Sequence, residues 1–445
     1  MVDGSRRHFS CCFSFLLWLL QASTLSYGVQ KLRMVNVVYR HGDRSPVGFF
    51  PADEHQDYWP QGPGQLSQIG MKQEYELGKF LKDRYVTEYK LLNSSYLLNE
   101  IYVRSSDKDR CIMSAQTQLN GLYPPHGKQI WRDNLDWQPI GVHVVPRTED
   151  YLLRPFDYKC PRLLELLAKS KEDKEYLDMA KQNEELLSYV STHAKMKVTV
   201  DTAHRIYDTL FCEKSHNLTL PAWSTNGTTW AGLRNLSYFN MMWLFKSPER
   251  AKLTGGNLVG AIVNNMKDYL KPTSKKLYIY SAHDTTVSAL LSALDVYDGI
   301  APAYSSAVMI ELFSDENDNK KNLTVRIMYR YGQSSVPRKL KLATCSEFCP
   351  LDDFIKKTAD VIPDDIDKAC GVGNEEEEKC VRTEVYKSFL AAFVAVTVLL
   401  GLILMCLCIR CCRQRCCRGN NLTVYNTDLL KDARLLDKQD YDSDT

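Results

Sequence analysis

The sequence predicts an α/β domain that carries a mainly helical lobe. Short apolar runs, such as 34–39 and 276–280, are typical of buried strands, and stretches with helical periodicity follow them. Between about 131 and 270 the chain changes to charged, helix-forming stretches that alternate with loops rich in aromatic residues and proline. The region 29–387 is long for one core and short for two independent domains, so we expect one α/β domain with a cap.

The α/β domain should consist of strands separated by amphipathic helices. We expect strands at 34–39, 100–104, 276–280, 308–313 and 323–331, the last two paired with each other. We expect helices at 67–85, 110–122 and 287–294. Polar clusters directly follow three of these strands, and the carboxyl ends of strands are where open α/β sheets bind ligands.

The N-terminus carries the pattern of a secretory signal peptide. Arg6 and Arg7 precede the short apolar stretch 13–20, and small residues follow, which predicts a signal peptide at 1–28 with cleavage after Gly28. The alternative is an uncleaved anchor, but the apolar stretch is too short to span a bilayer comfortably. We therefore expect the following domain to enter the secretory pathway.

A second apolar segment, 388–409, carries no charge and is long enough to cross a membrane as a helix. Arginines follow it at Arg410, Arg413, Arg415 and Arg418. The positive-inside rule then places the tail 410–445 in the cytosol and the rest in the lumen or outside the cell. We expect a type I protein with an α/β domain at 29–130 and 271–387, including an acidic stalk at 375–378, and a helical cap at 131–270.

The fifteen cysteines fit this topology. Six lie at the cytosolic edge of the predicted span: Cys406, Cys408, Cys411, Cys412, Cys416 and Cys417. Thiols in the cytosol stay reduced, and their position at the membrane favours palmitoylation. A zinc site is the alternative, but no histidine accompanies these cysteines. Seven lie in the lumenal part, so at least one has no partner within the chain: Cys111, Cys160, Cys212, Cys345, Cys349, Cys370 and Cys380. The same region carries glycosylation sequons at Asn93, Asn217, Asn226, Asn235 and Asn322.

The charged groups at the strand ends indicate a phosphate site. The formal net charge of +2 gives no reason to expect nucleic acid as a partner, so the local charge matters more. The clusters are Arg40-His41-Gly42-Asp43-Arg44, Arg104 and His283-Asp284. Arginine stays protonated at physiological pH, and its forked donors fit the oxygens of a phosphate ester.

These groups suffice for phosphoryl transfer without a metal or another cofactor. Arg40, Arg44 and Arg104 would hold the phosphate, and neutral His41 could attack phosphorus to form a phosphohistidine. The arginines should lower the pKa of His41 and keep it unprotonated in acid. Asp284 would protonate the leaving alkoxide, which it can do only while it is protonated, so we expect an acidic optimum.

The motifs resemble the histidine acid phosphatases, a branched phosphatase group of the histidine phosphatase superfamily. The family pattern Arg-His-Gly-x-Arg-x-Pro matches 40–46, Arg-Ser-Ser-Asp at 104–107 resembles its second arginine motif, and His283-Asp284 matches its His-Asp pair. The similarity covers nearly the whole lumenal region and, with the membrane span, resembles the lysosomal, prostatic and testicular branch.

The resemblance implies a mixed α/β sheet flanked by helices, of the phosphoglycerate mutase-like type, with a helical cap and a homodimer. It implies His41 as nucleophile, Asp284 as proton donor, and Arg40, Arg44, Arg104 and His283 as phosphate ligands. It also implies the disulfides Cys160–Cys370 and Cys345–Cys349. The family partner of Cys212 would lie near 308–313, where this chain has no cysteine. The pairing of Cys111, Cys212 and Cys380 therefore stays open.

We expect an acid phosphatase that hydrolyses small phosphomonoesters, with phosphoproteins as further substrates. The alternatives are another enzyme of the superfamily, a phosphomutase or an inositol polyphosphate phosphatase, and a catalytically inactive receptor or adhesion ectodomain. We expect the protein in the lysosomal membrane or in the plasma membrane. Tyr425 does not fit a tyrosine sorting signal, whereas 432–436 resembles an acidic dileucine signal.

Overall fold

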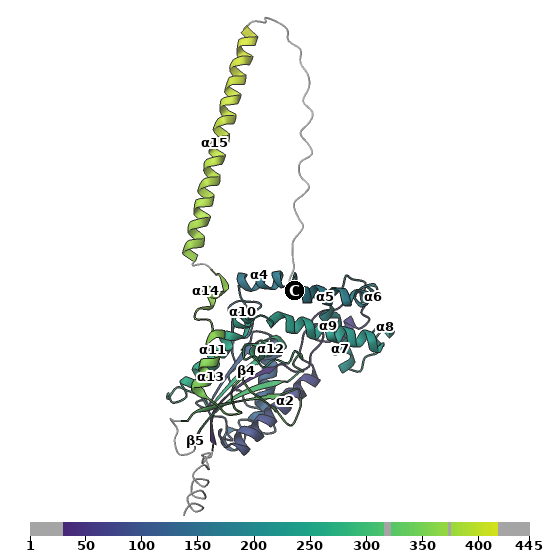
Figure 1. Cartoon of the computed structure of the whole chain (residues 1–445), viewed down its shortest axis with the longest axis vertical. Helices are drawn as coiled ribbons and strands as arrows, with labels where there is room; N and C mark the ends of the chain where they lie inside the picture. The colour runs from purple at the N-terminus through teal and green to yellow at the C-terminus, as the bar shows by residue number, and fades with distance from the viewer. Residues whose placement is uncertain (1–29, 316–321, 373–374, 417–445) are drawn as a thin grey trace, which may run out of the picture. The chain divides into compact units, whose positions relative to one another are not determined.

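The computed structural model describes residues 30–315, 322–372 and 375–416, without the side chains of 375–382 and 411–416 (Figure 1). The predicted signal peptide and most of the tail, with its sorting signals, lie outside these ranges. The chain divides into two compact units, one ending at Val372 and one beginning at Gly373. The first unit contains the sheet, its covering helices and the cap.

A mixed sheet lies at the centre of the first unit and confirms the predicted fold class. Its order is β3 (His143–Val145), β2 (Ile101–Ser106), β4 (Leu277–Ala282), β1 (Gln30–Arg40), β5 (Ala307–Asp315), β6 (Thr324–Arg330) and β7 (Arg338–Leu340), and β8 (Cys349–Pro350) also pairs with β6. The strands from β3 to β1 run parallel, whereas β5 is antiparallel to β1 and β6 to β5. The paired strands expected near 308–313 and 323–331 are thus confirmed.

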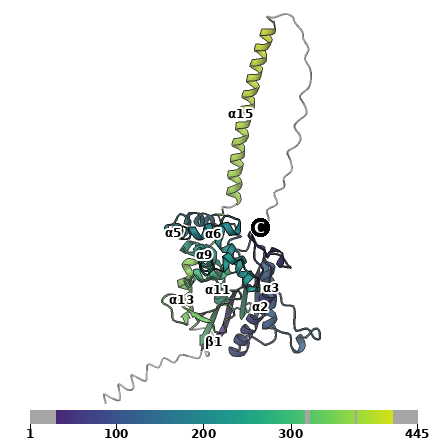
Figure 2. The ribbon, with the colours of Figure 1, turned by 90° about the vertical axis from the view of Figure 1, so that its right-hand side faces the viewer.

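Helices cover both faces of the sheet because its strands are apolar on both sides. One face packs against α2 (Gln68–Lys82), which continues as the π-helix η2 (Asp83–Glu88), and against α3 (Asp109–Leu122), with α2 and α3 side by side (Figure 2). The other face packs against α11 (Asn257–Lys267), α12 (Asp284–Ala293) and α13 (Leu351–Thr358). The short helices α10 (Pro248–Ala251) and η4 (Lys252–Gly256) lead into α11.

A group of helices forms the cap (Figure 1). They are α4 (Pro161–Ser170), α5 (Lys174–Gln182), α6 (Glu184–Ala194), α7 (Ala203–Ser215), α8 (Ala222–Thr225) and α9 (Gly227–Phe245). Apolar side chains of α5, α6, α7 and α9 form a core of their own, in which Phe50 from the loop after β1 is buried, whereas Leu163 of α4 packs beside the Cys160–Cys370 disulfide. The range 131–270 also contains β3 and α11, which belong to the sheet and its covering layer, so the cap is narrower than expected.

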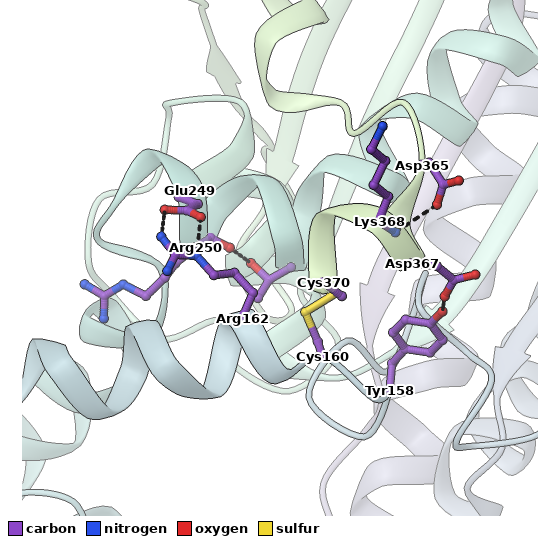
Figure 3. Close-up of a disulfide and its surroundings, with 10 residues drawn as sticks. Tyr158, Cys160, Arg162, Glu249, Arg250, Asp365, Asp367, Lys368 and Cys370 are labelled. Atoms are coloured by element: carbon purple, nitrogen blue, oxygen red, sulfur yellow. Dashed lines mark hydrogen bonds and ion pairs between the residues drawn. A yellow bond between two sulfur atoms is a disulfide. The ribbon is translucent and has the colours of Figure 1, made fainter. Parts of the chain in front are cut away.

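Both implied disulfides are present. Cys345–Cys349 closes a short loop, and Cys160–Cys370 joins the start of α4 to the end of α14 (Ile366–Cys370) (Figure 3). Around the longer link, Arg162 pairs with Glu249, and the Tyr158 hydroxyl bonds to the Asp367 carboxylate. The remaining short helices are η1 (Gln56–Tyr58), η3 (Gly127–Gln129) and η5 (Ala359–Val361).

The second unit is one long helix, α15 (Glu375–Cys416). Within it, Thr383–Arg410 is long and apolar enough to cross a membrane, and it contains the predicted span 388–409. The acidic run 375–378, predicted as a stalk before the membrane, forms the first turn of this helix. Its charges do not interrupt the helix because glutamate has a high helix propensity.

The Cys160–Cys370 link should contribute more to stability than the Cys345–Cys349 link. The former joins cysteines 210 positions apart and the latter cysteines four positions apart, and a cross-link restricts the unfolded chain more when its loop is long. We expect the double variant Cys160→Ala/Cys370→Ala to lose about 3–5 kcal/mol of unfolding free energy. Thermal denaturation of both double variants measures this, and an equal or larger loss for Cys345→Ala/Cys349→Ala would contradict it.

Candidate active site

The register of the parallel strands brings the distant polar clusters to one edge of the sheet. Arg40, at the end of β1, lies opposite Ala282, at the end of β4. His41 and His283 follow these residues directly, and their rings lie 5.5 Å apart, edge to face. The His41 amide donates a hydrogen bond to the Ala282 carbonyl at 3.0 Å, which fixes the two loops to each other.

Gly42 is required because the loop after β1 touches the start of α2. A Cβ atom added at Gly42 would lie 2.4 Å from the carbonyl oxygen of Gly70, and one added at Gly70 would lie 2.1 Å from that of Asp43. Neither backbone has room to yield. The Ser67 side chain caps α2 by accepting from the Gly70 amide at 3.0 Å. The His41 loop therefore rests on the N-terminus of α2.

The His41 ring has one nitrogen free to act as a nucleophile. Its Nδ1 lies 2.8 Å from the Gly42 carbonyl oxygen. A carbonyl oxygen can only accept, so Nδ1 carries the proton and Nε2 keeps its lone pair. The side chain is fixed by this bond before any substrate arrives.

The His41 imidazole is neutral in mild acid. Burial lowers its pKa well below the usual value, and the charges of Arg110, Arg40, His283 and Arg44 lower it further. The sequence-based expectation named the arginines as the cause, but desolvation has the larger effect. Both effects favour the unprotonated form that can attack phosphorus.

Arg40 and Arg44 are held in place by partly buried carboxylates and other neighbours. Arg40 pairs with Asp284 at 3.0 Å and donates to the Pro302 carbonyl at 2.6 Å, while its guanidinium lies 4.1 Å from the ring centre of Tyr304. Arg44 binds Asp208 of α7 through two bonds of 2.9 and 3.0 Å. The donors of Arg44 therefore link the phosphate site to the cap.

The structure brings Arg110, and not Arg104, to this edge. Arg110 lies in the first turn of α3 and donates to His283 Nδ1 at 3.4 Å and to the Gly64 carbonyl at 3.3 Å. Because Arg110 donates to Nδ1, the opposite nitrogen Nε2 carries a proton and donates to Ser106 Oγ at 2.8 Å. Among the charges around His41, that of Arg110 has the largest effect on its pKa.

Arg104 lies inside β2, in register with Tyr280, and does not reach the strand end. Its guanidinium pairs with the buried carboxylate of Asp150, which in turn accepts the Leu153 amide at 3.0 Å. The expected phosphate ligand is thus used to fix the loop 150–154. The expectation failed because β2 extends to Ser106, beyond the predicted end at Arg104. Arg110 stands four residues beyond the end of β2, in the first turn of α3.

Asp43 joins the His41 loop to the cap rather than facing the site. Its carboxylate accepts from His216 Nε2, at the end of α7, at 2.7 Å and from Ser67 Oγ at 2.5 Å. The Asp43 amide donates to the Gln73 side chain at 2.8 Å. Asp43 therefore orients the residues around it instead of facing the site.

Two thiols flank the site without forming a disulfide. Cys212 Sγ lies 3.4 Å from the Tyr304 hydroxyl and 3.6 Å from Arg44 Nη1, and Cys111 Sγ lies 3.6 Å from His283 Nε2. Burial raises the pKa of Cys212 to about 12 and that of Cys111 to about 11, so both stay protonated. They pack as small apolar groups. The side chain of Cys380 is outside the described set.

The predicted glycosylation sites all lie on the surface. The asparagines of the five sequons are exposed: Asn93, Asn217, Asn226, Asn235 and Asn322. Three of them lie in the cap range, at or between α7 and α9. Their exposure permits modification, which itself remains a prediction.

Comparison with known proteins agrees with this geometry. The family model for the histidine phosphatase superfamily (branch 2) matches residues 31–330. The chain is 41% identical to prostatic acid phosphatase of Homo sapiens, over 82% of this chain and 94% of that protein, and 41% identical to lysosomal acid phosphatase of Xenopus laevis, over 77% and 79%.

Among solved structures, a phytase of Klebsiella sp. ASR1 superposes with a TM-score of 0.59 at 16% identity, over 75% of this chain and 96% of that one. The Hafnia alvei phytase in complex with tartrate gives 0.58 at 16% identity, over 77% and 98%. At such identities the likeness shows the fold alone. The match of the family model over most of the folded unit, together with the relatives, shows that this chain belongs to branch 2 of the histidine phosphatase superfamily.

Proposed function

We propose that this protein is an acid phosphatase that hydrolyses phosphate monoesters through a phosphohistidine at His41. The observation that carries the proposal is the neutral imidazole of His41, with Nδ1 fixed by Gly42 and Nε2 free among three guanidinium groups. The relatives at about 41% identity are acid phosphatases by name, which supports the same reaction here.

In the first step, His41 Nε2 attacks phosphorus and the bond to the ester oxygen breaks. Arg40, Arg44 and Arg110 balance the charge on the non-bridging oxygens, and the phosphoryl group stays electrostatically stabilised as the bond breaks. Asp284 gives its proton to the departing alkoxide. In the second step a water molecule attacks phosphorus, Asp284 takes the proton back, and inorganic phosphate leaves.

His283 is the remaining proposed phosphate ligand. Its ring faces that of His41, and Ser106 and Arg110 hold its orientation through its two nitrogens. Burial, followed by the surrounding arginines, lowers the pKa of His283 well below its usual value. The lowered pKa favours the neutral ring, which accepts from Arg110 and so positions its guanidinium.

The proposed setting is a type I membrane protein with the catalytic unit in the lumen or outside the cell. The apolar helix Thr383–Arg410, the disulfides and the lysosomal relatives support this setting. A shift in electrophoretic mobility after treatment with a peptide N-glycosidase tests the lumenal placement. No shift would contradict it.

The homodimer implied by the resemblance has a suitable surface in β3, which lies at one edge of the sheet. Val144 of β3 is exposed, and so are the nearby apolar side chains of Ile130, Trp131 and Trp137. An edge strand with exposed apolar residues can pair with a second copy. Sedimentation velocity on the purified protein tests this, and a monomer would contradict it.

Replacement of His41 should remove the covalent intermediate. In mild acid we expect wild-type protein to release p-nitrophenol and to trap phosphate on His41, and His41→Ala to lose about 10³-fold or more in kcat. Because the His41 pKa lies well below its usual value, kcat/KM should fall on the acid side only far below pH 6.5, where the imidazole gains a proton. An intact but inactive wild-type protein would favour the receptor alternative.

Asp284 should matter most for poor leaving groups. Asp284→Asn cannot donate a proton, so we expect hydrolysis of alkyl phosphates to slow by about 10²-fold or more. Hydrolysis of p-nitrophenyl phosphate should slow much less, because its phenolate leaves without protonation. The comparison of single-turnover rates for the two substrates decides the matter. Equal slowing of both would remove Asp284 from the role of acid.

Replacement of Arg110 should mainly lower kcat/KM, whereas replacement of Arg104 should mainly lower stability. Arg110→Gln removes a proposed phosphate ligand, so kcat/KM should fall about 10²-fold. The loss of its charge also raises the His41 pKa, so the acid limb of the pH profile should move to higher pH. Arg104→Gln instead leaves buried Asp150 without its partner and should lower stability by about 3 kcal/mol, with a smaller fall in kcat/KM. The reverse pattern would restore Arg104 as the ligand.

A further inference from the structure

A second group of cations lies beside the proposed phosphate site. Ser106 at the end of β2 lies in register with Val145 at the end of the parallel strand β3. Lys108 follows the first strand and Arg147 follows the second, so both leave the sheet at the edge that carries His283. None of these positions was singled out by the sequence patterns. The register of β3 places them together.

A third cation, Arg154, joins this group through Asp157. The Asp157 carboxylate accepts from Arg147 Nη2 at 2.7 Å and pairs with Arg154 through its other oxygen. Arg154 and Asp157 line a cavity of about 440 Å³, together with Thr285, which directly follows Asp284. The leaving group of a bound ester departs toward Asp284, so this cavity is next to the leaving group.

The three cations are not neutralised by the acids around them. The single carboxylate of Asp157 pairs with both Arg147 and Arg154. Among the ion pairs of the described residues, none includes Lys108. Asp107, Asp109 and Glu149 are close in sequence but exposed to solvent. Two other residues that line the cavity, Lys171 and Asp201, by contrast neutralise each other at 2.5 Å.

The charges of these cations act on one another. Burial lowers the pKa of Lys108, and the charges of Arg147, Arg154 and Arg110 lower it further, while Asp157 opposes them. Arg154 also helps to lower the pKa of His283, so its charge reaches the phosphate site. An anion placed between Lys108 and Arg154 would relieve this repulsion.

We propose that Lys108, Arg147 and Arg154 form a second anion subsite, which binds an acidic group carried by the leaving group of the substrate. The preferred substrates are then phosphomonoesters with a second negative group, a carboxylate or another phosphate. The subsite rests on the proposed phosphatase activity, since it selects among substrates for that reaction. Arg147 and Lys108 recognise the charge, and Arg154 presents it beside Asp284.

The test compares substrates that carry different charges on the ring, in wild-type protein and in variants, so that the intrinsic reactivity of each ester cancels. We would measure kcat/KM of the purified full chain for phenyl phosphate, 4-carboxyphenyl phosphate, hydroquinone bisphosphate and 4-(trimethylammonio)phenyl phosphate. Wild-type protein should prefer the anionic esters, and the Lys108→Met and Arg147→Met variants should lose about threefold to tenfold of that preference each. The kcat/KM values of 4-carboxyphenyl phosphate and hydroquinone bisphosphate show whether the subsite prefers a carboxylate or a second phosphate.

Two further variants control for changes in overall charge. Lys174→Met removes one positive charge from α5, at an exposed lysine paired with Asp178, and should leave the preference unchanged. Asp157→Asn releases Arg147 and Arg154 and should increase the preference for the anionic esters. Equal kcat/KM for neutral and anionic esters in wild-type protein, or a preference that survives in both Lys108→Met and Arg147→Met, would overturn the subsite.

Failure of the phosphatase itself gives a different result. If the wild-type protein hydrolyses none of the esters, the proposed reaction is wrong. Titration calorimetry with phenyl phosphate and 4-carboxyphenyl phosphate then still reports the subsite. Tighter binding of the carboxylate, weakened in Lys108→Met, supports it, and equal binding of both esters overturns it.

Discussion

The site depends on holding several guanidinium groups close together in a buried region of the protein. Each charge that prepares the protein for a phosphate dianion also repels its neighbours. The fold balances this with carboxylates from different elements, Asp208 from α7 for Arg44 and Asp284 from α12 for Arg40. Neutral His41 and the ring of Tyr304 fill the space between them without adding charge. The cap therefore supplies one of the two carboxylates that balance these charges.

The same elements fix the position of His41, the proposed nucleophile. Gly42 and Gly70 allow the His41 loop to touch α2 through backbone atoms alone, and Asp43 then ties this loop to α2 and to His216 at the end of α7. A loop fixed on both sides has little freedom to rotate the imidazole. The Gly42 carbonyl fixes which nitrogen attacks, so the tautomer is decided by the backbone rather than by the substrate.

Sequence patterns predicted the parts of this site that follow long, apolar strands. The apolar runs of β1 and β4 end where polar residues begin, so the sequence predicted correctly that His41 and His283 lie at the sheet edge. Arg104 and Arg110 could not be told apart in this way, because the choice depends on where β2 ends and on the partner Asp150, which comes from a distant loop. The strand β3, only three residues long, carries too few side chains to show a periodic pattern. The cation group beside it was invisible for the same reason.

The position of Asp284 links the acid requirement to substrate binding. In the empty site its carboxylate pairs with Arg40, an arrangement that needs the ionised form. A phosphate bound at Arg40 competes for the same donors, and its negative charge favours a proton on the neighbouring carboxyl group. The ligand would thus help to create the acid that its own leaving group needs. In the proposed reaction Asp284 thus exchanges its ion pair with Arg40 for the donation of a proton to the leaving group.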